Sequence, residues 1–454
     1  MFNLKIRKVK KISTKNRKIN GSFPEKTTVN LIKSLAKNEN SNIIKQHPIL
    51  WSKAKNYSIF DNKGNKWIDF SSTIFVTNGG HSNANIVQAI KKNASKLLHA
   101  YSYVTDQKLK FIKSLIKFIP NYLNGVTLLS SGSEASERAI KICRLYGLKK
   151  NKEKKYIVCF NGNYHGKTMG SAMISGTKED IKWIGYKDPN IIRLNFPYPW
   201  ILKKLDILGK KRFLNDLNLI KKKINTKKIC AIFLESYQGY GAIFYPKDYV
   251  KALSKWCRKN KTLLVFDEIQ AGFGRTGKVF AYQHYGVKPN LVICGKGISG
   301  SLPLSALVGE RNLLNLDKNH TSTHGGNTLC CAAAEANLKE LKRLKLINRS
   351  KILGKILFSE VNKWQKKFKN LIPYIDGKGL VCGVFFSKFN NPALLDVKFV
   401  HDIVEKSLER GVFSLATYRG TLKIAPPLTI SKSALLEGLN VIEEVINELY
   451  NKKK

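Results

Sequence analysis

A lysine flanked by glycines is the residue of this sequence with the clearest chemical potential. Lys296 follows an apolar run at 291–294 and stands between Gly295 and Gly297. Glycine on both sides allows the backbone to approach a ligand closely. A partly desolvated lysine at the end of a strand has a lowered pKa, so its amine can attack a carbonyl group. A surface lysine in a loop is the competing interpretation in a chain with 80 Lys and Arg residues.

A carboxylate follows another apolar run. Asp267 comes directly after residues 263–266. Open α/β sheets bind their ligands at the edge where the parallel strands end. An aspartate at this edge can keep a pyridine nitrogen protonated, which turns a pyridine cofactor into an electron sink. An aspartate that only caps the next turn would have the same sequence context.

The third candidate is a small-residue turn that could bind an anion. Ser131, Gly132 and Ser133 follow the apolar run 126–129 and precede a predicted helix at 136–146. Free amides and the helix dipole at such a position favour a phosphate group. The spacing of Ser131 and Glu134 also matches a capping box, which is a purely structural alternative.

These three features occur along one alternating pattern of strands and helices. Together they supply a phosphate-binding site, a partner for a ring nitrogen and an amine that can attack an aldehyde. The combination predicts pyridoxal phosphate (PLP) as the cofactor, held as a Schiff base on Lys296.

The elements that must position these residues form an α/β fold. Apolar, strand-like runs alternate with helical segments; the runs are 126–129, 156–160, 229–234, 263–266, 291–294 and 306–308. This alternation predicts a mostly parallel sheet covered by helices. A hairpin at 57–60 and 66–70 precedes the sheet. After it come a helical stretch at 322–371, strands at 377–386 and 422–424, and helices at 397–410 and 432–450.

We therefore expect two domains. The predicted boundaries are a basic tail at 1–20, the N-terminal part of a small domain at 21–80, a large cofactor-binding domain at 81–330 and the C-terminal part of the small domain at 331–454. The small domain is then an α+β piece built from both ends of the chain. A chain of 454 residues is long enough to form more than one core.

Composition excludes several classes of protein. The formal net charge is +49, but lysines are spread along the chain and do not form the basic stripe with aromatic platforms that nucleic-acid grooves use. We expect no nucleic-acid partner and, without an apolar run of about 18–20 residues, no membrane partner.

The eight cysteines show neither metal-ligand spacing nor a disulfide pattern. We therefore expect a cytoplasmic protein with no metal. The first 20 residues contain no acidic residue and favour a solvated tail over a transit peptide.

Longer motifs resemble a known family. The run Phe-Asp-Glu-Ile-Gln-Ala-Gly-Phe-Gly-Arg-Thr-Gly at 266–277, Gly-Lys-Gly at 295–297, Pro-Leu-Ser at 303–305 and Thr-Ser-Thr-His-Gly-Gly-Asn at 321–327 are similar to the class-III aminotransferases of PLP fold type I. The resemblance extends from about residue 57 to the C-terminus. It implies a large PLP-binding domain and a small domain formed by the two chain ends.

The resemblance also implies roles for individual residues. Lys296 would form the Schiff base and move the substrate proton, and Asp267 would pair with the pyridine nitrogen. Tyr164 would stack on the cofactor ring, and Thr323 would reach the phosphate of a neighbouring subunit in a homodimer with shared active sites. The remaining implied cofactor contacts are Ser131, Gly132, Ser133, His165, Glu235 and Gln270.

The implied reaction is transamination between a primary amine, alpha or omega, and a 2-oxo acid such as pyruvate or 2-oxoglutarate. Members that act on ornithine or 4-aminobutyrate have arginine, glutamate and arginine where this chain has Lys167, Tyr240 and Lys423. Lysine keeps the charge of arginine but loses its bidentate fork. We expect Arg419 and Lys423 to bind the carboxylate of the oxo acid. The amine pocket is expected to include Ile74, Phe75, Tyr101 and Tyr103.

Two alternatives remain at this stage. A PLP-dependent aminomutase, decarboxylase or lyase acting on an anionic amine would use the same cofactor site. A basic binding protein with vestigial PLP machinery is a weaker alternative, because Lys296, Asp267 and the Gly132–Ser133 pair are all intact.

Overall fold

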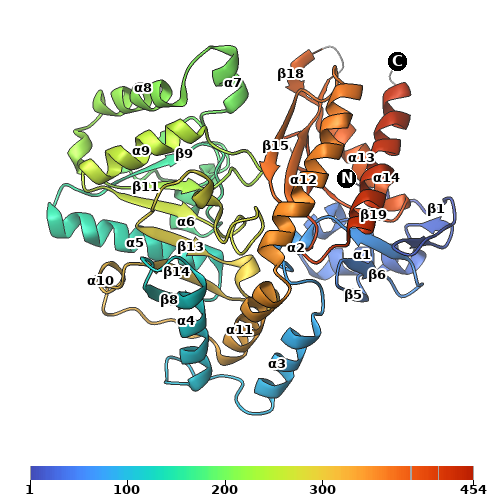
Figure 1. Ribbon diagram of the computed structural model, residues 1–454, viewed down its shortest axis with the longest axis horizontal. Coiled ribbons are helices and arrows are strands. Elements are labelled where there is room, and N and C mark those ends of the chain that lie inside the picture. The colour runs from blue at the N-terminus through green and yellow to red at the C-terminus, as the bar shows by residue number, and fades with distance from the viewer. Residues whose placement is uncertain (1, 389–390, 418, 453–454) are drawn as a thin grey trace. The chain divides into compact units, whose positions relative to one another are not determined.

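A computed structural model describes residues 2–388, 391–417 and 419–452 (Figure 1). The chain divides into two compact units. The large unit contains residues 74–79 and 84–351, and the small unit contains residues 1–73, 80–83 and 352–454. No helix within the described ranges has the length and apolar character needed to cross a membrane.

The large unit is built on a seven-stranded sheet with the order β10-β9-β11-β12-β13-β14-β8. The strands are β8 (Gly125–Leu129), β9 (Tyr156–Phe160), β10 (Ile191–Leu194), β11 (Ile229–Glu235), β12 (Leu263–Asp267), β13 (Leu291–Cys294) and β14 (Ser305–Gly309). Only β14 runs antiparallel to its neighbours within this described sheet. The predicted mostly parallel sheet is confirmed. The edge strand β10 was not predicted, because its short, half-buried sequence gives a weak pattern.

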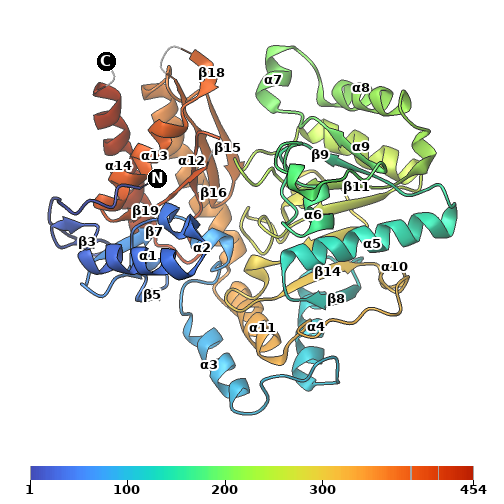
Figure 2. The ribbon, with the colours of Figure 1, turned by 180° about the vertical axis from the view of Figure 1, so that it is seen from behind.

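Helices cover both faces of this sheet (Figures 1 and 2). The helix α5 (Gly132–Lys150) packs on one face, and α9 (Lys247–Lys259), with α8 (Gly209–Lys221) beside it, covers the other. The helices α3 (Ala84–Ala94) and α4 (Asp106–Phe118) each pack against α11 (Thr328–Arg343). The shorter helices of the large unit are α6 (Met169–Met173), α7 (Pro199–Lys204) and α10 (Arg311–Leu314).

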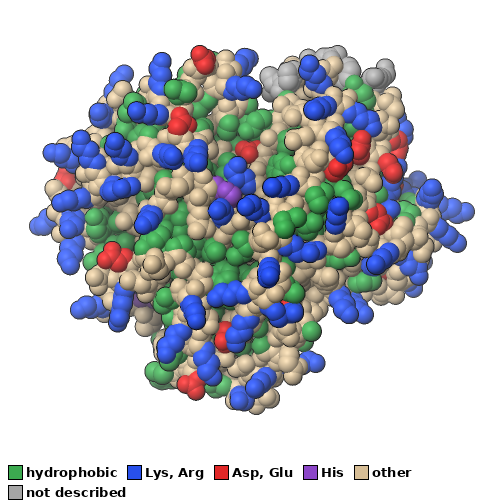
Figure 3. All heavy atoms as spheres, viewed as in Figure 1, with side chains coloured by type: hydrophobic (Ala, Val, Ile, Leu, Met, Phe, Trp, Pro, Cys, Tyr) green, Lys and Arg blue, Asp and Glu red, His purple; other side chains and the backbone are tan. Residues whose placement is uncertain are grey.

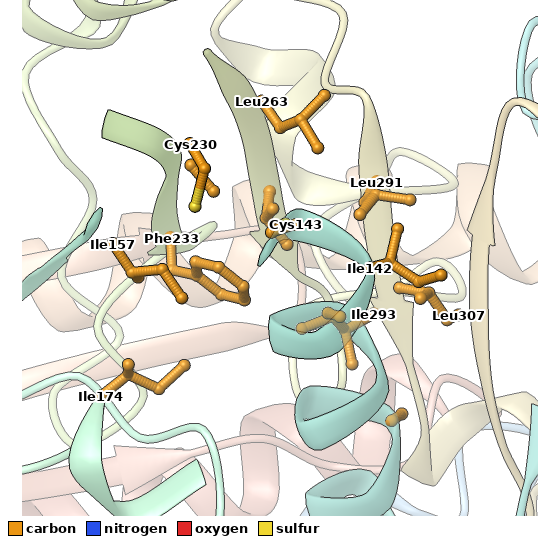
Figure 4. Packing of buried hydrophobic residues seen from close by; sticks show 14 of the residues in the cluster. Ile142, Cys143, Ile157, Ile174, Cys230, Phe233, Leu263, Leu291, Ile293 and Leu307 are labelled. Carbon is orange, nitrogen blue, oxygen red and sulfur yellow. The ribbon is translucent and has the colours of Figure 1, made fainter. Parts of the chain in front are cut away.

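The core of the large unit lies between α5 and the sheet (Figure 4). Ile142 and Cys143 of α5 lie against apolar side chains from successive strands; these include Ile157, Phe233, Leu263, Leu291, Ile293 and Leu307. All residues of β11, β12 and β13 are buried, as expected for strands covered on both faces. A Cβ at Gly147 of α5 would overlap the carbonyl oxygen of Lys154. The glycine therefore lets the helix approach the sheet.

The small unit contains a four-stranded antiparallel sheet with the order β15-β16-β21-β20. Its strands are β15 (Tyr374–Lys378), β16 (Val381–Phe385), β20 (Leu415–Thr417) and β21 (Thr421–Ile424). A second sheet contains β2 (Ile12–Ser13), β3 (Lys18–Ile19), β5 (Lys53–Lys55), β6 (Ser58–Phe60), β7 (Lys66–Asp69) and β19 (Val412–Phe413). The predicted hairpin is the antiparallel pair β6 and β7.

The remaining elements of the small unit are mainly helices. They are α1 (Lys26–Asn38), α13 (Val397–Glu409) and α14 (Lys432–Asn451), with the short strands β1 (Arg7–Lys8), β4 (Ser22–Phe23), β17 (Ser387–Lys388) and β18 (Asn391–Leu395). Two elements cross the boundary between the units, namely α2 (Ser72–Phe75) and α12 (Leu346–Lys367). All four residues of α2 have positive φ angles, between 48° and 72°.

Two expected boundaries differ from the structure. The large unit extends to residue 351 rather than 330, because α11 packs on α3 and α4 of that unit. Residues 1–20 are not a detached tail, since β2 and β3 join the second sheet. Arg17 also forms an ion pair with Glu437 of α14 at 2.7 Å. Arg7 likewise pairs with Glu405 and Glu409 of α13, so two arginines of this segment are bound to C-terminal helices.

The high positive charge is distributed over the surface. Figure 3 shows Lys and Arg side chains scattered across the visible face among apolar and neutral side chains. Acidic side chains are interspersed among them and are fewer, in line with 80 basic and 31 acidic residues in the chain.

Candidate active site

A cavity of about 210 Å³ lies in the large unit. It is lined by Gly132, Ser133, Tyr164, His165, Gly166, Glu235, Asp267, Ile269, Gln270 and Lys296. These residues come from the carboxyl ends of β9, β11, β12 and β13 and from the start of α5. Four strand ends and one helix start therefore meet at a single edge of the sheet, where ligands of α/β folds bind.

The start of α5 carries a capping box and borders the cavity. The Ser131 hydroxyl accepts a bond from the amide of Glu134 at 3.3 Å, and the Glu134 carboxylate accepts the amide of Ser130 at 2.8 Å. The amides of Gly132 and Ser133 have no partner among the residues that the structure describes. Ser131 therefore caps the helix, while Gly132 and Ser133 line the cavity. Their binding of an anion stays a prediction.

Asp267 is held in one orientation at the end of β12. Its Oδ2 lies 2.9 Å from Nδ1 of His165, and its Oδ1 accepts the amide of Ile269 at 2.9 Å. His165 is itself buried, and its amide donates to the hydroxyl of Ser175 at 2.7 Å. The buried Nε2 of His165 has no partner within the described ranges. A carboxylate fixed in this way can present charge to a ring nitrogen in the cavity.

Lys296 lies directly after β13 with its side chain on the cavity. Burial lowers its pKa below the ordinary value, although Asp267 and Glu235 oppose this shift. Its φ angle is +45°, a conformation that costs a non-glycine residue about 1–2 kcal/mol.

The two flanking glycines accommodate protein side chains. A Cβ at Gly295 would lie 3.2 Å from Ile269, and a Cβ at Gly297 would lie 2.6 Å from Nδ2 of Asn78. The sequence suggested that these glycines admit a ligand. In the structure, the close approach that requires them is made by neighbouring side chains of the chain itself.

Glu235 joins two loops at the cavity. One of its oxygens accepts the amide of Tyr164 at 2.9 Å, and both accept the amide of Gly239, at 3.1 and 3.2 Å. Burial raises the pKa of Glu235 to about 7, with Asp267 adding to the rise and His165 opposing it. The ring of Tyr164 meets that of Tyr240 edge to face, with centroids 6.2 Å apart.

Two cavity residues were not predicted from the sequence. A Cβ at Gly166, where φ is +138°, would overlap the hydroxyls of Ser133 and Ser171. Gly166 therefore lets the hydroxyls of Ser133 and Ser171 lie against its backbone. Ile269 packs beneath both Gly132 and Gly295. Gly166 follows the implied contacts Tyr164 and His165, and Ile269 belongs to the motif at 266–277. A glycine or isoleucine at such a place does not by itself indicate a role.

The other predicted site residues lie outside this cavity lining. Thr323 is exposed on the loop before α11, Ile74 is 48% exposed, and Phe75 is buried. Arg419 and Lys423 belong to the small unit, where Lys423 is buried on β21. Tyr101 and Tyr103 are exposed on the segment between α3 and α4. Their functional roles stay predictions.

The cavity residues fit pyridoxal phosphate. Unpaired amides at the start of a 19-residue helix suit its phosphate, and the hydroxyl of Ser133 lies beside Gly166 on the same cavity. Asp267, supported by His165, suits a pyridine nitrogen, and Lys296 offers an amine to its aldehyde. This set of groups is that of a PLP-dependent enzyme.

Comparison with known proteins assigns the family. The sequence model of the family "aminotransferase class-III" matches residues 40–446. An acetylornithine aminotransferase of Caldanaerobacter subterraneus is 32% identical over 89% of this chain and 96% of its own length. The mitochondrial ornithine aminotransferase of Oryza sativa is 31% identical over 88% of this chain and 81% of its own length.

Solved structures agree with this assignment. The ornithine aminotransferase of Toxoplasma gondii superposes with a TM-score of 0.83 and 25% identity, covering 94% of this chain and 97% of that one. A transaminase from the marine bacterium Virgibacillus has a TM-score of 0.85 at 22% identity, covering 94% of this chain and all of that one, which shows the shared fold. The chain belongs to the class-III aminotransferases. It is a PLP-dependent enzyme of fold type I that transfers the amino group of a primary amine to a 2-oxo acid.

Proposed function

We propose that Lys296 is the residue to which pyridoxal phosphate is covalently attached and that the same amine moves the substrate proton. The observation that carries this proposal is the meeting of Lys296, Asp267 and the start of α5 around one cavity. Burial lowers the pKa of Lys296, which favours the neutral amine that both tasks require.

The bound cofactor supplies an aldehyde that takes up the amino group and a protonated ring that withdraws electrons. Asp267, oriented by His165, holds the proton at the ring nitrogen. Gly132 and Ser133 bind the phosphate, Tyr164 stacks on the ring, and Gln270 contacts the phenolic oxygen. Glu235 fixes the loop that carries Tyr164 through the backbone amide of that residue.

The substrates are proposed to be an omega-amine and either pyruvate or 2-oxoglutarate. The relatives named for ornithine and acetylornithine support such a donor. A panel of ornithine, N-acetylornithine and 4-aminobutyrate with each oxo acid tests this directly. The expected result is an amino acid formed in a 1:1 ratio with the oxo acid consumed. If the amine is consumed and no amino acid is formed from the oxo acid, the enzyme is instead an aminomutase or a lyase.

Arg419 and Lys423 are proposed to bind the carboxylate of the oxo acid, and Ile74 and Phe75 to border the amine. A charged hydrogen bond of this kind contributes about 1.5–3 kcal/mol. Arg419→Ala should therefore raise the KM for the oxo acid roughly 10–100-fold and leave the half-reaction with the amine unchanged. An unchanged half-reaction with the oxo acid would refute the assignment.

A homodimer with shared sites is proposed from an exposed apolar surface. Leu98, Tyr103 and Val104 are 62%, 74% and 98% exposed, and patches of this kind mark interfaces. Asn327 donates to the carbonyl oxygen of Leu98 at 2.9 Å. This bond joins the apolar segment to the loop that carries Thr323. Thr323 would therefore lie close to the proposed dimer interface and could reach the active site of the neighbouring subunit.

Subunit mixing tests the shared site. A dimer that contains one Lys296→Ala subunit and one Thr323→Ala subunit has one site with both Lys296 and Thr323 and one site with neither. Mixing and refolding the two variants should restore activity above that of either variant alone. Activity equal to the average of the two parents, or a monomeric mass, would contradict the proposal.

We further propose that the enzyme acts in the cytoplasm. All eight cysteines are free, and seven of them are buried, which suits a reducing compartment. Fractionation of cells should place the activity with cytoplasmic marker enzymes, and activity in a membrane or extracellular fraction would contradict this location.

A further inference from the structure

Arg275, in the motif at 266–277, is a buried arginine that is not among the proposed cofactor contacts. Arg275 has no exposed surface. Its guanidinium donates to Oδ1 of Asn78 at 2.6 Å and lies 5.3 Å from the ring centre of Phe75. A buried guanidinium with a planar fork can hold one side chain in a fixed orientation. In this protein that side chain is Asn78.

The other end of the Asn78 amide is also fixed. Its Nδ2 donates to the carbonyl oxygen of Phe273 at 3.2 Å and lies 3.5 Å from that of Gly272. Asn78 is 1% exposed, so both ends of its amide are satisfied inside the large unit. The side chain therefore joins the segment 74–79 to the loop that follows Asp267.

Asn78 also lies against the loop that carries Lys296. A Cβ at Gly297 would be 2.6 Å from Nδ2 of Asn78 and 3.5 Å from the carbonyl oxygen of Phe75. Asn337 of α11 also contacts this loop: its amide donates to the carbonyl oxygens of Gly297 and Ile298 at 2.9 and 3.2 Å. Two buried asparagines thus contact the turn directly after Lys296.

This arrangement matters because the Lys296 backbone is strained. Its φ angle is +45°, and such conformations persist only where the surroundings over-determine them. We propose that Asn78, held by Arg275, is a positioning residue that keeps the Lys296 backbone in its left-handed conformation and so aims its amine into the cavity. This inference rests on the proposed role of Lys296 as the attachment residue.

The first test is Asn78→Ala, measured with pyridoxal phosphate alone and then in turnover. The visible circular dichroism of the bound cofactor should fall at least about twofold, and the pH midpoint of its visible absorbance should shift. With the best donor of the amine panel, kcat should fall roughly 10–100-fold while KM changes less than about threefold, as expected for a small misplacement of a reacting group.

The matched control is Asn290→Ala. Asn290 accepts the amide of Leu264 at 2.8 Å at the opposite edge of the sheet, so its loss affects stability without touching the cavity. It should leave the cofactor spectrum and kcat within about twofold of wild type. The inference fails if Asn78→Ala behaves in the same way as this control.

A second pair of variants keeps the test informative if Asn78→Ala does not fold. Asn78→Asp retains the size and the acceptor for Arg275 but loses the donor to Phe273, and it should show the same spectral change in weaker form. Gly297→Ala should disturb the spectrum through overlap with Asn78. Combining it with Asn78→Ala should restore part of the lost signal, because the truncated side chain leaves room for the new methyl group. Additive losses in the double variant would overturn the inference.

Failure of this inference can be separated from failure of the proposed function. If Lys296→Ala still binds the cofactor covalently, the attachment role itself is wrong. If Lys296→Ala loses the covalent bond while Asn78→Ala and Gly297→Ala keep the wild-type spectrum and kcat, only the positioning role is wrong.

Discussion

The two edges of the seven-stranded sheet each carry a lysine with little access to solvent, half-buried at Lys296 and buried at Lys154. Lys296 follows β13 at the carboxyl edge, and Lys154 precedes β9 at the amino edge. Burial lowers the pKa of both amines. Lys154 donates to the carbonyl oxygens of Lys227 and Asn260, both at 3.2 Å, and is 6% exposed. Lys296 instead lines a cavity with Asp267 and Glu235.

Desolvation lowers the pKa of both amines, so it does not by itself distinguish a reactive lysine from a structural one. At the amino edge, the ammonium group satisfies carbonyl oxygens at the starts of neighbouring strands and serves the fold. At the carboxyl edge, the strand ends bring carboxylates and a helix start around the amine, so that its lowered pKa can serve chemistry.

Removing the charge of Asp267 should affect the reaction most. Asp267→Asn keeps the size of the side chain but loses the charge that faces His165 and the ring nitrogen. We expect kcat to fall roughly 10²–10³-fold, as when one preorganised electrostatic partner is removed. Asp216→Asn is the matched control, because Asp216 is also buried but bonds Tyr249 and Arg212 away from the cavity. Equal losses of kcat in the two variants would show that the position of Asp267 at the cavity gives its charge no special role.

Displacing the side chain of Ser133 should weaken cofactor binding. Gly166→Ala places a methyl group against Ser133 and Ser171 at a positive φ angle, which costs about 1–3 kcal/mol. Equilibrium titration should show a Kd for pyridoxal phosphate roughly 10–100-fold higher. Gly286→Ala controls for backbone strain alone, because Gly286 has φ +70° and a Cβ there would meet nothing within 4 Å. A Kd that does not distinguish the two variants would argue against the phosphate assignment.

The titration of Glu268 should have a smaller effect, on the pH dependence of stability. Burial raises the pKa of Glu268, at the carboxyl edge, to about 7, above its ordinary 4.5. Its protonated form is the one that folding favours, so its contribution to stability is complete below pH 4.5 and is lost as the pH rises through 7. The loss is at most about 1.4 kcal/mol per pH unit. The melting temperature of cofactor-free Glu268→Gln, relative to wild type, should therefore rise from pH 5 to pH 8. A constant difference would show that Glu268 does not titrate in this range.

The sequence predicted the parts of the molecule that depend on local pattern. The strands that carry Glu235, Asp267 and Lys296 are continuous apolar runs, so their positions and their parallel arrangement followed from the alternation with helices. The start of α5 was recognisable because small residues stand between a strand and a helix. The structure places these predicted residues around one cavity.

Features that depend on distant contacts were not predictable. The expected boundary at residue 330 failed because α11 is helical in either unit, and only its packing on α3 and α4 assigns it. The basic residues at 1–20 looked like a tail because their partners, such as Glu437, lie more than 400 residues away in the sequence. For the same reason, nothing in the local sequence connects Asn78 with Gly297 or explains why the glycine is required.

The most direct test of the central claim is reductive trapping of the cofactor. The enzyme is incubated with pyridoxal phosphate, reduced with borohydride and digested, and the labelled lysine is located by peptide mass spectrometry. The label should be found on Lys296, vanish in Lys296→Ala and persist in Lys154→Met, which removes the buried amine of the amino edge. A label on any other lysine of the wild-type chain, or one retained by Lys296→Ala, would contradict the account.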